Sequence, residues 1–195
     1  MGGRSTRLGR DKALEPFGTS NLLERVLSRL SLFKSDIIIV AHARQELSSV
    51  VQNRKLRVVF DIYPDKGPLG GIYTGLFTST TPYNLLVAGD MPFLNVDLLR
   101  YMIQLSSEFD LVAPRKGNYF EPLHAVYSHA CLKPIEDMLK QGELKIDKLF
   151  DRVKVRYIDS KEIDRFDPQH LSFFNINTEA DLKKAKELIT QKRTS

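Results

Sequence analysis

The first twelve residues contain a run of glycines and cations suited to phosphate binding. Gly2 and Gly3 begin the run, and Arg4, Arg7 and Lys12 follow. Glycines let backbone N–H groups turn towards an anion without a Cβ in the way, and the cations supply charge for a triphosphate. The run has neither the Gly-Lys-Ser/Thr ending of a Walker loop nor a Gly-x-Gly-x-x-Gly fingerprint. Alone, it predicts either a phosphate loop or a basic, flexible N-terminal segment.

A second candidate is Asp90, which follows an aliphatic run and precedes Pro92 by two residues. An acidic residue at the carboxyl end of a buried strand faces the cleft of an open α/β sheet, and Mg²⁺ prefers hard carboxylate oxygens. We therefore interpret Asp90 as a Mg²⁺ ligand. The alternative is a simple Gly-Asp-x-Pro turn that binds no metal.

A glycine-rich stretch around Pro68 is the third candidate. Gly67, Gly70, Gly71 and Gly75 would let the backbone pass close to a planar ring and then begin a helix. A tight junction between a loop and a helix is the alternative.

The elements that must position these residues alternate between aliphatic and amphipathic stretches. We expect strands at residues 36–40, 57–60, 84–87, 111–113, 124–127 and 154–158. We expect helices at residues 21–32, 46–52, 70–78, 95–106, 130–140 and 179–189, with Asn95 and Thr178 as N-caps. This order predicts a three-layer α/β/α fold with a mostly parallel sheet.

Composition restricts the class of protein. A chain of 195 residues fits one domain, and no apolar run approaches the roughly 20 residues that span a bilayer. The net charge of +5 and pI near 9.3 suit an anionic ligand. Part of that charge lies near the C-terminus, which we interpret as the solvated face and frayed end of a helix, so nucleic-acid binding is not expected. The single cysteine, Cys131, is expected to be buried, and a cytoplasmic location is expected.

These segments together resemble one known family. The run Gly-Gly-Arg-Ser-x-Arg-Leu-Gly-x-Asp-Lys-Ala-Leu is similar to the signature of the molybdenum cofactor guanylyltransferases, the MobA-like proteins. Gly-Pro-Leu-Gly-Gly-Ile and Gly-Asp-Met-Pro resemble two further family motifs. The resemblance implies a single Rossmann-like nucleotidyltransferase domain, residues 1–190, followed by a basic tail, residues 191–195.

The same resemblance implies a reaction and a set of site residues. The reaction would transfer GMP from GTP to molybdopterin with release of pyrophosphate, with Mg²⁺ as cofactor. Arg7, Lys12 and Asp90 would be catalytic, and Asp90 would bind the metal. The GTP- and pterin-binding residues would be Gly2, Gly3, Lys12, Asp61, Gly67, Gly71, Asp90, Asn175 and Asn177.

The acceptor end of the site is expected to involve two asparagines. In the family, the residues that match Asn175 and Asn177 face the acceptor, and amides can both donate and accept hydrogen bonds. A turn residue and a helix cap are the respective alternatives. His124, beside an apolar strand, is expected to be a hydrogen-bonded structural residue. No Ser/His/Asp or Cys/His arrangement stands out, which favours direct transfer without a covalent intermediate.

Rival functions and partners follow from the same motifs. A related nucleotidyltransferase could use CTP, or an acceptor such as a sugar phosphate, a phospholactate or an isoprenoid precursor. A nucleotide-binding protein without catalysis is the rival from another class. The resemblance also implies contact with molybdenum cofactor biosynthesis proteins and molybdoenzyme chaperones. In the family an aliphatic central strand precedes the two glycines, whereas Met1 stands directly before Gly2, so we expect lower stability and activity than in a longer chain.

Overall fold

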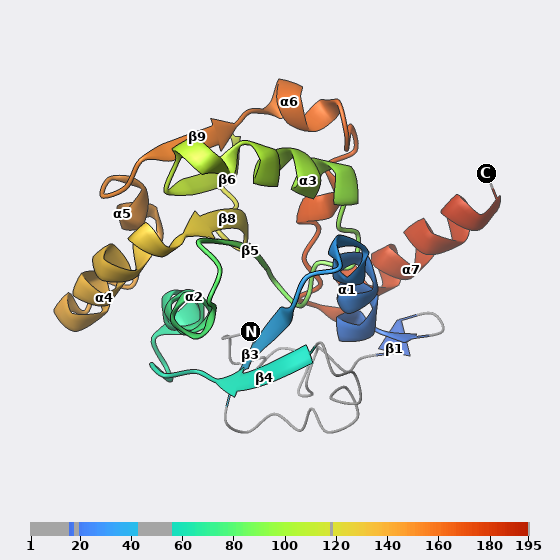
Figure 1. Ribbon diagram of the computed structural model, residues 1–195. Coiled ribbons are helices and arrows are strands. Elements are labelled where there is room, and N and C mark those ends of the chain that lie inside the picture. Colours follow the sequence, from blue (N-terminus) through green and yellow to red (C-terminus); the bar gives the residue numbers. More distant parts are fainter. Residues whose placement is uncertain (1–15, 18–19, 43–55, 118, 195) are drawn as a thin grey trace.

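The computed structural model describes residues 16–17, 20–42, 56–117 and 119–194 (Figure 1). Its larger sheet has the order β5 (Tyr83–Val87), β8 (His124–Ser128), β6 (Leu111–Lys116) and β7 (Tyr119–Phe120), with β9 (Val155–Ile158) paired to β6. Two smaller sheets join β3 (Ile37–Ala41) to β4 (Leu56–Phe60) and β1 (Pro16–Phe17) to β2 (Ser20–Asn21). The α-helices are α1 (Leu22–Leu30), α2 (Gly67–Thr78), α3 (Val96–Gln104), α4 (Leu132–Gln141), α5 (Asp147–Phe150), α6 (Ser160–Asp164) and α7 (Glu179–Thr194).

The strands are mostly parallel in direction, with β8 as the main exception. Strand β3 is parallel to β4, and β6 is parallel to β9. Strand β8 is antiparallel to both β5 and β6, so these two neighbours run the same way. The reversal of β8 arises because β6 turns back through Gly117, whose φ is +59°, into β7 and β8. The amino end of β8 therefore lies at the same edge of the sheet as the carboxyl end of β5.

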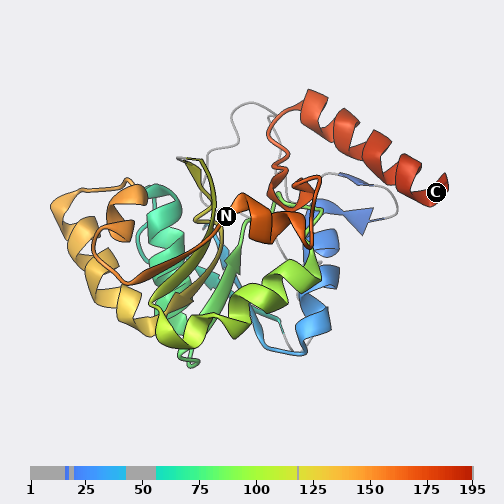
Figure 2. The same ribbon diagram turned by 90° about the horizontal axis from the view of Figure 1, so that it is seen from above.

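Side chains of the central strands alternate between two apolar cores, which gives three layers (Figure 2). Leu111, Ala113, Ala125 and Tyr127 pack against α2, α4 and α5 on one face. The intervening residues Val112 and Val126 pack against α1, α3 and α6 on the other. The fold class predicted from the sequence is confirmed.

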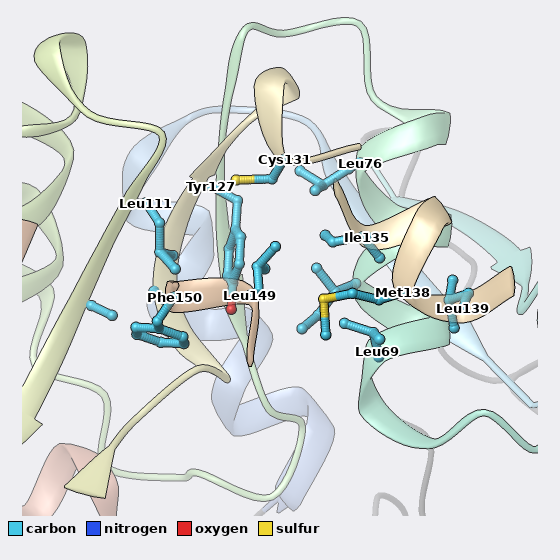
Figure 3. Packing of buried hydrophobic residues seen from close by; sticks show 13 residues of the cluster. Leu69, Leu76, Leu111, Tyr127, Cys131, Ile135, Met138, Leu139, Leu149 and Phe150 are labelled. Atoms are coloured by element: carbon cyan, nitrogen blue, oxygen red, sulfur yellow. The ribbon is translucent and has the colours of Figure 1, made fainter. Parts of the chain in front are cut away.

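The core on the α2 side joins α2, α4 and α5 to the central strands. In Figure 3, leucines of α2 face Ile135 and Met138 of α4, and Tyr127 lies near Leu111 and Leu149. The Tyr127 hydroxyl leaves this core by donating to the carbonyl oxygen of Pro122 at 2.8 Å. Cys131 is buried as expected, and burial raises the pKa of its thiol to about 12, so the thiol stays protonated at neutral pH. The buried Tyr127 side chain thus holds the backbone at Pro122, just before β8, in place.

Most predicted elements appear within a few residues of their expected ends. Asn95 and Thr178 cap α3 and α7 as predicted, through their side-chain oxygens. The sequence did not reveal the two-residue strands β1, β2 and β7 or the short helices α5 and α6, because two to five residues show no clear periodicity. Helix α7 extends to Thr194, so most of the predicted tail is helical. The predicted helix at residues 46–52 lies outside the described residues. Across the part of the chain that the structure describes, every helix is too short or too polar to cross a bilayer.

Helix α2 begins three residues earlier than predicted, and its first turn packs on the preceding loop. Gly67 is the first helical residue, with φ at +63°, and Pro68 follows in the first turn, where its missing N–H has no cost. Gly70 is the position that has no room: a Cβ there would lie 2.6 Å from the carbonyl oxygen of Tyr63. A Cβ at Gly71 would meet no described atom within 4 Å.

This contrast predicts opposite effects of two neighbouring alanines. Gly70→Ala should lower the free energy of unfolding by about 1–3 kcal/mol, because the backbone of Tyr63 must move. Gly71→Ala should leave it unchanged or raise it by up to about 1 kcal/mol, because alanine has the higher helix propensity. Urea denaturation of both variants measures the difference, and equal effects would contradict the packing of α2 on the Tyr63 loop.

Candidate functional site

Asp90 lies just beyond the carboxyl end of β5, in the half-buried turn expected from the sequence. Two backbone hydrogen bonds connect this turn to distant segments. The Ala88 N–H donates to the carbonyl oxygen of Leu123 at 2.9 Å, and the Ile176 N–H donates to that of Asp90 at 3.0 Å. The turn is thus joined both to the amino end of β8 and to the segment before α7.

Helix α1 holds the next residues of the same turn. Arg25 Nε donates to the carbonyl oxygen of Pro92 at 3.1 Å. The Arg25 guanidinium also lies over the rings of Phe17 and Phe93, at 5.5 Å and 5.8 Å from the centroids. Such cation–π contacts and the hydrogen bond restrict both the arginine and the turn. The position of Asp90 therefore depends on α1 as well as on β5.

The asparagines Asn175 and Asn177 flank Ile176 in the sequence, so the bond to Asp90 brings the backbone of this segment beside the Asp90 turn. Ile176 is fully buried in a core with Phe17, Leu22 and Phe93. The amide of Asn175 donates to the Phe173 carbonyl oxygen at 3.5 Å, and the backbone N–H of Asn177 donates to Asp181 at 3.0 Å. Asp181 caps α7 reciprocally with Thr178, which anchors this segment.

A buried carboxylate holds the segment that precedes these asparagines in the sequence. Asp167 is 7% exposed and accepts hydrogen bonds from the N–H groups of Leu171 and Ser172 at 3.1 Å and 2.7 Å. The Ser172 hydroxyl in turn accepts from the N–H of Asn95 at 3.0 Å. This chain of bonds connects the start of α3 with the segment that leads to Asn175. Sequence reasoning missed Asp167, although an acid before Pro168 is a turn signal.

Asp61 follows β4 and is bonded within its own loop. Its N–H donates to the Ala41 carbonyl oxygen at 3.0 Å, which continues the β3–β4 ladder. Its Oδ1 accepts from the N–H of Tyr63 at 3.0 Å and from the hydroxyl of Thr74 at 2.9 Å. The Thr74 oxygen also accepts from the N–H of Ile62 at 2.9 Å. Asp61 therefore joins the loop to α2 through Oδ1.

His124 is buried but does not form the hydrogen bonds expected of a structural histidine. It is 0% exposed, and neither ring nitrogen has a hydrogen-bond partner among the described residues. Its ring packs edge-on against Phe173 at 4.9 Å between centroids. Burial lowers the pKa of His124 to about 4, against a smaller opposing effect of Asp167, so the ring is neutral at pH 7. The ring belongs to the apolar support of the site, and the expectation of a hydrogen bond was wrong.

Comparison with known proteins places this geometry in a family. The model of the MobA-like NTP transferase domain matches residues 1–156. The chain belongs to the MobA-like NTP transferase family. A probable molybdenum cofactor guanylyltransferase of Pelotomaculum thermopropionicum is 35% identical over 193 residues, which is 99% of this chain and 92% of that protein. A molybdenum cofactor guanylyltransferase of Desulfosudis oleivorans is 34% identical, with 100% and 95% covered.

A solved structure agrees with the family assignment. Molybdopterin-guanine dinucleotide biosynthesis protein A of Archaeoglobus fulgidus superposes with a TM-score of 0.83 and 28% identity, over 97% of this chain and 96% of that one. Membership of this family makes the chain a nucleotidyltransferase. The described site residues therefore belong to an enzyme that transfers a nucleotidyl group.

The structure brings some predicted site residues together and leaves others apart. The Ile176–Asp90 bond joins the segment that carries Asn175 and Asn177 to the Asp90 turn. Asp61, Gly67 and Gly71 lie together on the β4–α2 connection, and no described contact joins them to Asp90. Gly2, Gly3, Arg7 and Lys12 lie outside the described residues.

The carboxylate of Asp90 fits a Mg²⁺ ion that is shared with a substrate. The described residues contain no group of three or more His, Cys, Asp or Glu side chains that could hold a metal. Mg²⁺ commonly keeps several waters and is bound by one or two carboxylates together with substrate phosphates. A single half-buried carboxylate at a strand end suits that mode rather than a site made by protein alone.

Thr74 offers a test of how Asp61 is positioned. Thr74→Val should lower the free energy of unfolding by about 1–3 kcal/mol, because it leaves Asp61 and the N–H of Ile62 without this partner. Thr74→Ser retains the hydroxyl and should cost less. Urea denaturation compares the two variants, and a loss in Thr74→Val no larger than that in Thr74→Ser would contradict the role of the hydroxyl.

His124 predicts a specific dependence of stability on pH. Its pKa is lower in the folded protein than the ordinary 6.5, so the unfolded chain binds the extra proton and stability falls as pH decreases from about 6.5 to about 4. Between pH 7 and pH 4.5 the loss due to His124 should be about 2–3 kcal/mol. His124→Phe should lack this part of the loss in urea denaturation. An identical pH dependence in both proteins would contradict the assignment.

Proposed function

We propose that this enzyme transfers GMP from GTP to molybdopterin, releasing pyrophosphate and forming molybdopterin guanine dinucleotide. The observation that carries the proposal is the Ile176–Asp90 hydrogen bond, because it joins the segment that carries Asn175 and Asn177 to the turn that carries the metal-ligand candidate. The relatives named guanylyltransferases, which match nearly the whole chain, support the choice of nucleotide and acceptor. Both substrates are anions, which suits the net charge of +5.

The chemistry needs little beyond positioning. An oxygen of the acceptor's terminal phosphate forms a bond to the α-phosphorus of GTP, the bond from that phosphorus to the bridging oxygen breaks, and pyrophosphate leaves with the electron pair. The attacking phosphate is already anionic at neutral pH, so no strong general base is required. Bound Mg²⁺ would neutralise charge on the phosphates. Among the described residues, Asp90 would supply the carboxylate that binds Mg²⁺, and Asn175 and Asn177 would supply amides on the acceptor side.

The remaining site residues extend the proposal on both sides of the transferred group. Gly2, Gly3, Arg7 and Lys12 would bind the triphosphate, as the family resemblance implies. Asp61, Gly67 and Gly71 would form the nucleotide side, where the absence of a described atom within 4 Å of a Cβ at Gly71 suits a closely approaching ring. A cytoplasmic location and contacts with cofactor biosynthesis proteins and molybdoenzyme chaperones complete the proposal. The buried thiol of Cys131 suits a reducing compartment.

One assay distinguishes the guanylyl reaction from reactions with other nucleotides and from a non-catalytic nucleotide-binding protein. Pyrophosphate release is measured with Mg²⁺ and molybdopterin, with GTP, CTP, ATP and UTP supplied in turn. Release with GTP supports the guanylyl reaction, and release with CTP would replace it by the cytidylyl reaction. GTP binding without release from any nucleotide would favour a non-catalytic binding protein or another acceptor.

Asp90 provides the matched variant for this assay. Asp90→Asn should lower the rate of pyrophosphate release by about 100-fold or more, because it removes the charge that binds Mg²⁺ while keeping the side chain's shape. Asp151→Asn makes the same chemical change at an exposed position and should leave the rate unchanged. The Asp90 backbone oxygen keeps its bond in the variant, so the urea midpoint should move little. Near-normal turnover of Asp90→Asn would exclude the metal role.

A further inference from the structure

In the hairpin that β7 and β8 form with β6, a rigid kink separates β7 from β8. The kink consists of Glu121, Pro122 and Leu123. The Glu121 N–H donates to the carbonyl oxygen of Pro114 at 3.1 Å, and the Glu121 carbonyl oxygen accepts from the His124 N–H at 3.0 Å. The Pro122 and Leu123 carbonyl oxygens accept from the Tyr127 hydroxyl and the Ala88 N–H. Each backbone carbonyl of the kink is therefore bonded, and the backbone at Glu121 is held in one position.

The register of the sheet places this kink beside the Asp90 turn. Val126 pairs with both Leu85 of β5 and Val112 of β6, so these residues are level across the sheet. Counting three residues towards the carboxyl ends of β5 and β6, Ala88 is level with Arg115. Leu123 lies between these two strands and its carbonyl oxygen accepts from the Ala88 N–H. The kink thus lies between the ends of β5 and β6. Strands β3 and β4 lie on the other side of β5 (Figure 1).

The side chain of Glu121 has no structural task in the described protein. It is partly exposed, and its carboxylate makes no hydrogen bond or salt bridge with any residue that the structure describes. Burial raises the pKa of Glu121, and the charge of Lys116 partly opposes this effect. A half-buried carboxylate without a partner costs folding free energy, so its presence on a rigid kink beside the active site indicates a role in binding.

We propose that Glu121 is a specificity-determining residue that binds the 2-amino-4-oxopyrimidine edge of the acceptor's pterin. This edge carries a ring N–H next to an exocyclic amino group, and the two oxygens of one carboxylate accept from that pair of donors. The inference rests on the proposed function for the identity of the acceptor. Guanine carries the same pair of donors. The pterin is favoured because the kink lies across β5 from the β4–α2 connection, where the proposal places the nucleotide.

The test compares one change in the protein with one change in the ligand. The full chain is titrated with 6-hydroxymethylpterin and with the corresponding lumazine, which has an oxo group in place of the 2-amino group, and the ligand's fluorescence is followed. Wild type should bind the pterin about 10- to 100-fold more tightly than the lumazine. Glu121→Gln should bind both about equally, because its amide presents one acceptor and an N–H donor. Glu187→Gln, on the exposed face of α7, should behave as wild type.

GTP binding, measured by calorimetry without acceptor, shows whether Glu121 binds the pterin or the guanine of GTP. It should be unchanged in Glu121→Gln, and a loss of GTP affinity with the pterin preference retained would overturn the proposal in favour of guanine. A wild-type protein without preference for the pterin, or a variant that keeps it, would also overturn it. These titrations do not require turnover. Failure of wild type to release pyrophosphate from GTP and molybdopterin would therefore count against the proposed function alone.

Discussion

The hydrogen bond from the Ile176 N–H to the Asp90 carbonyl oxygen is the constraint on which the described site depends. It joins two residues that lie far apart in the sequence, and three side chains hold the two segments in place. Arg25 of α1 bonds to the turn after Asp90, and the buried side chain of Ile176 anchors the segment that donates the bond. Asp167 fixes the residues just before that segment. The Asp90 turn and the segment that carries Asn175 and Asn177 thereby become neighbours through their backbones.

Sequence patterns predicted this site where the residue type had one dominant physical meaning. Aliphatic runs predicted the main strands, because buried strands in an α/β fold are apolar on both faces. Asp90 was placed at a strand end by the same reasoning. The direction of β8 was not predicted, because alternation of apolar residues is the same in parallel and antiparallel strands, and only the short turn at Gly117 distinguishes them.

Other features depended on contacts between distant residues and could not be seen in the sequence. Gly70 and Gly71 are adjacent and chemically identical, yet only Gly70 lies against the Tyr63 carbonyl. Thr74 looks like any small helical residue until its hydroxyl is found between Asp61 and Ile62. His124 was expected to be bonded because most buried polar groups are, and its apolar surroundings in the structure overrule that tendency. Asp61 was predicted as a binding residue, and its loop-forming role through Oδ1 was not.

The reversed direction of β8 has a consequence for how such an enzyme can change its substrate. Because β8 runs against its neighbours, a tight hairpin, and not only long helical crossovers, delivers residues to the active edge. Insertions or deletions in the Gly117 turn would alter the proposed acceptor side while the β4–α2 connection keeps its own hydrogen bonds. The proposed nucleotide side and the proposed acceptor side are therefore built by different segments of the chain, so the hairpin turn can vary in length without rebuilding the β4–α2 connection.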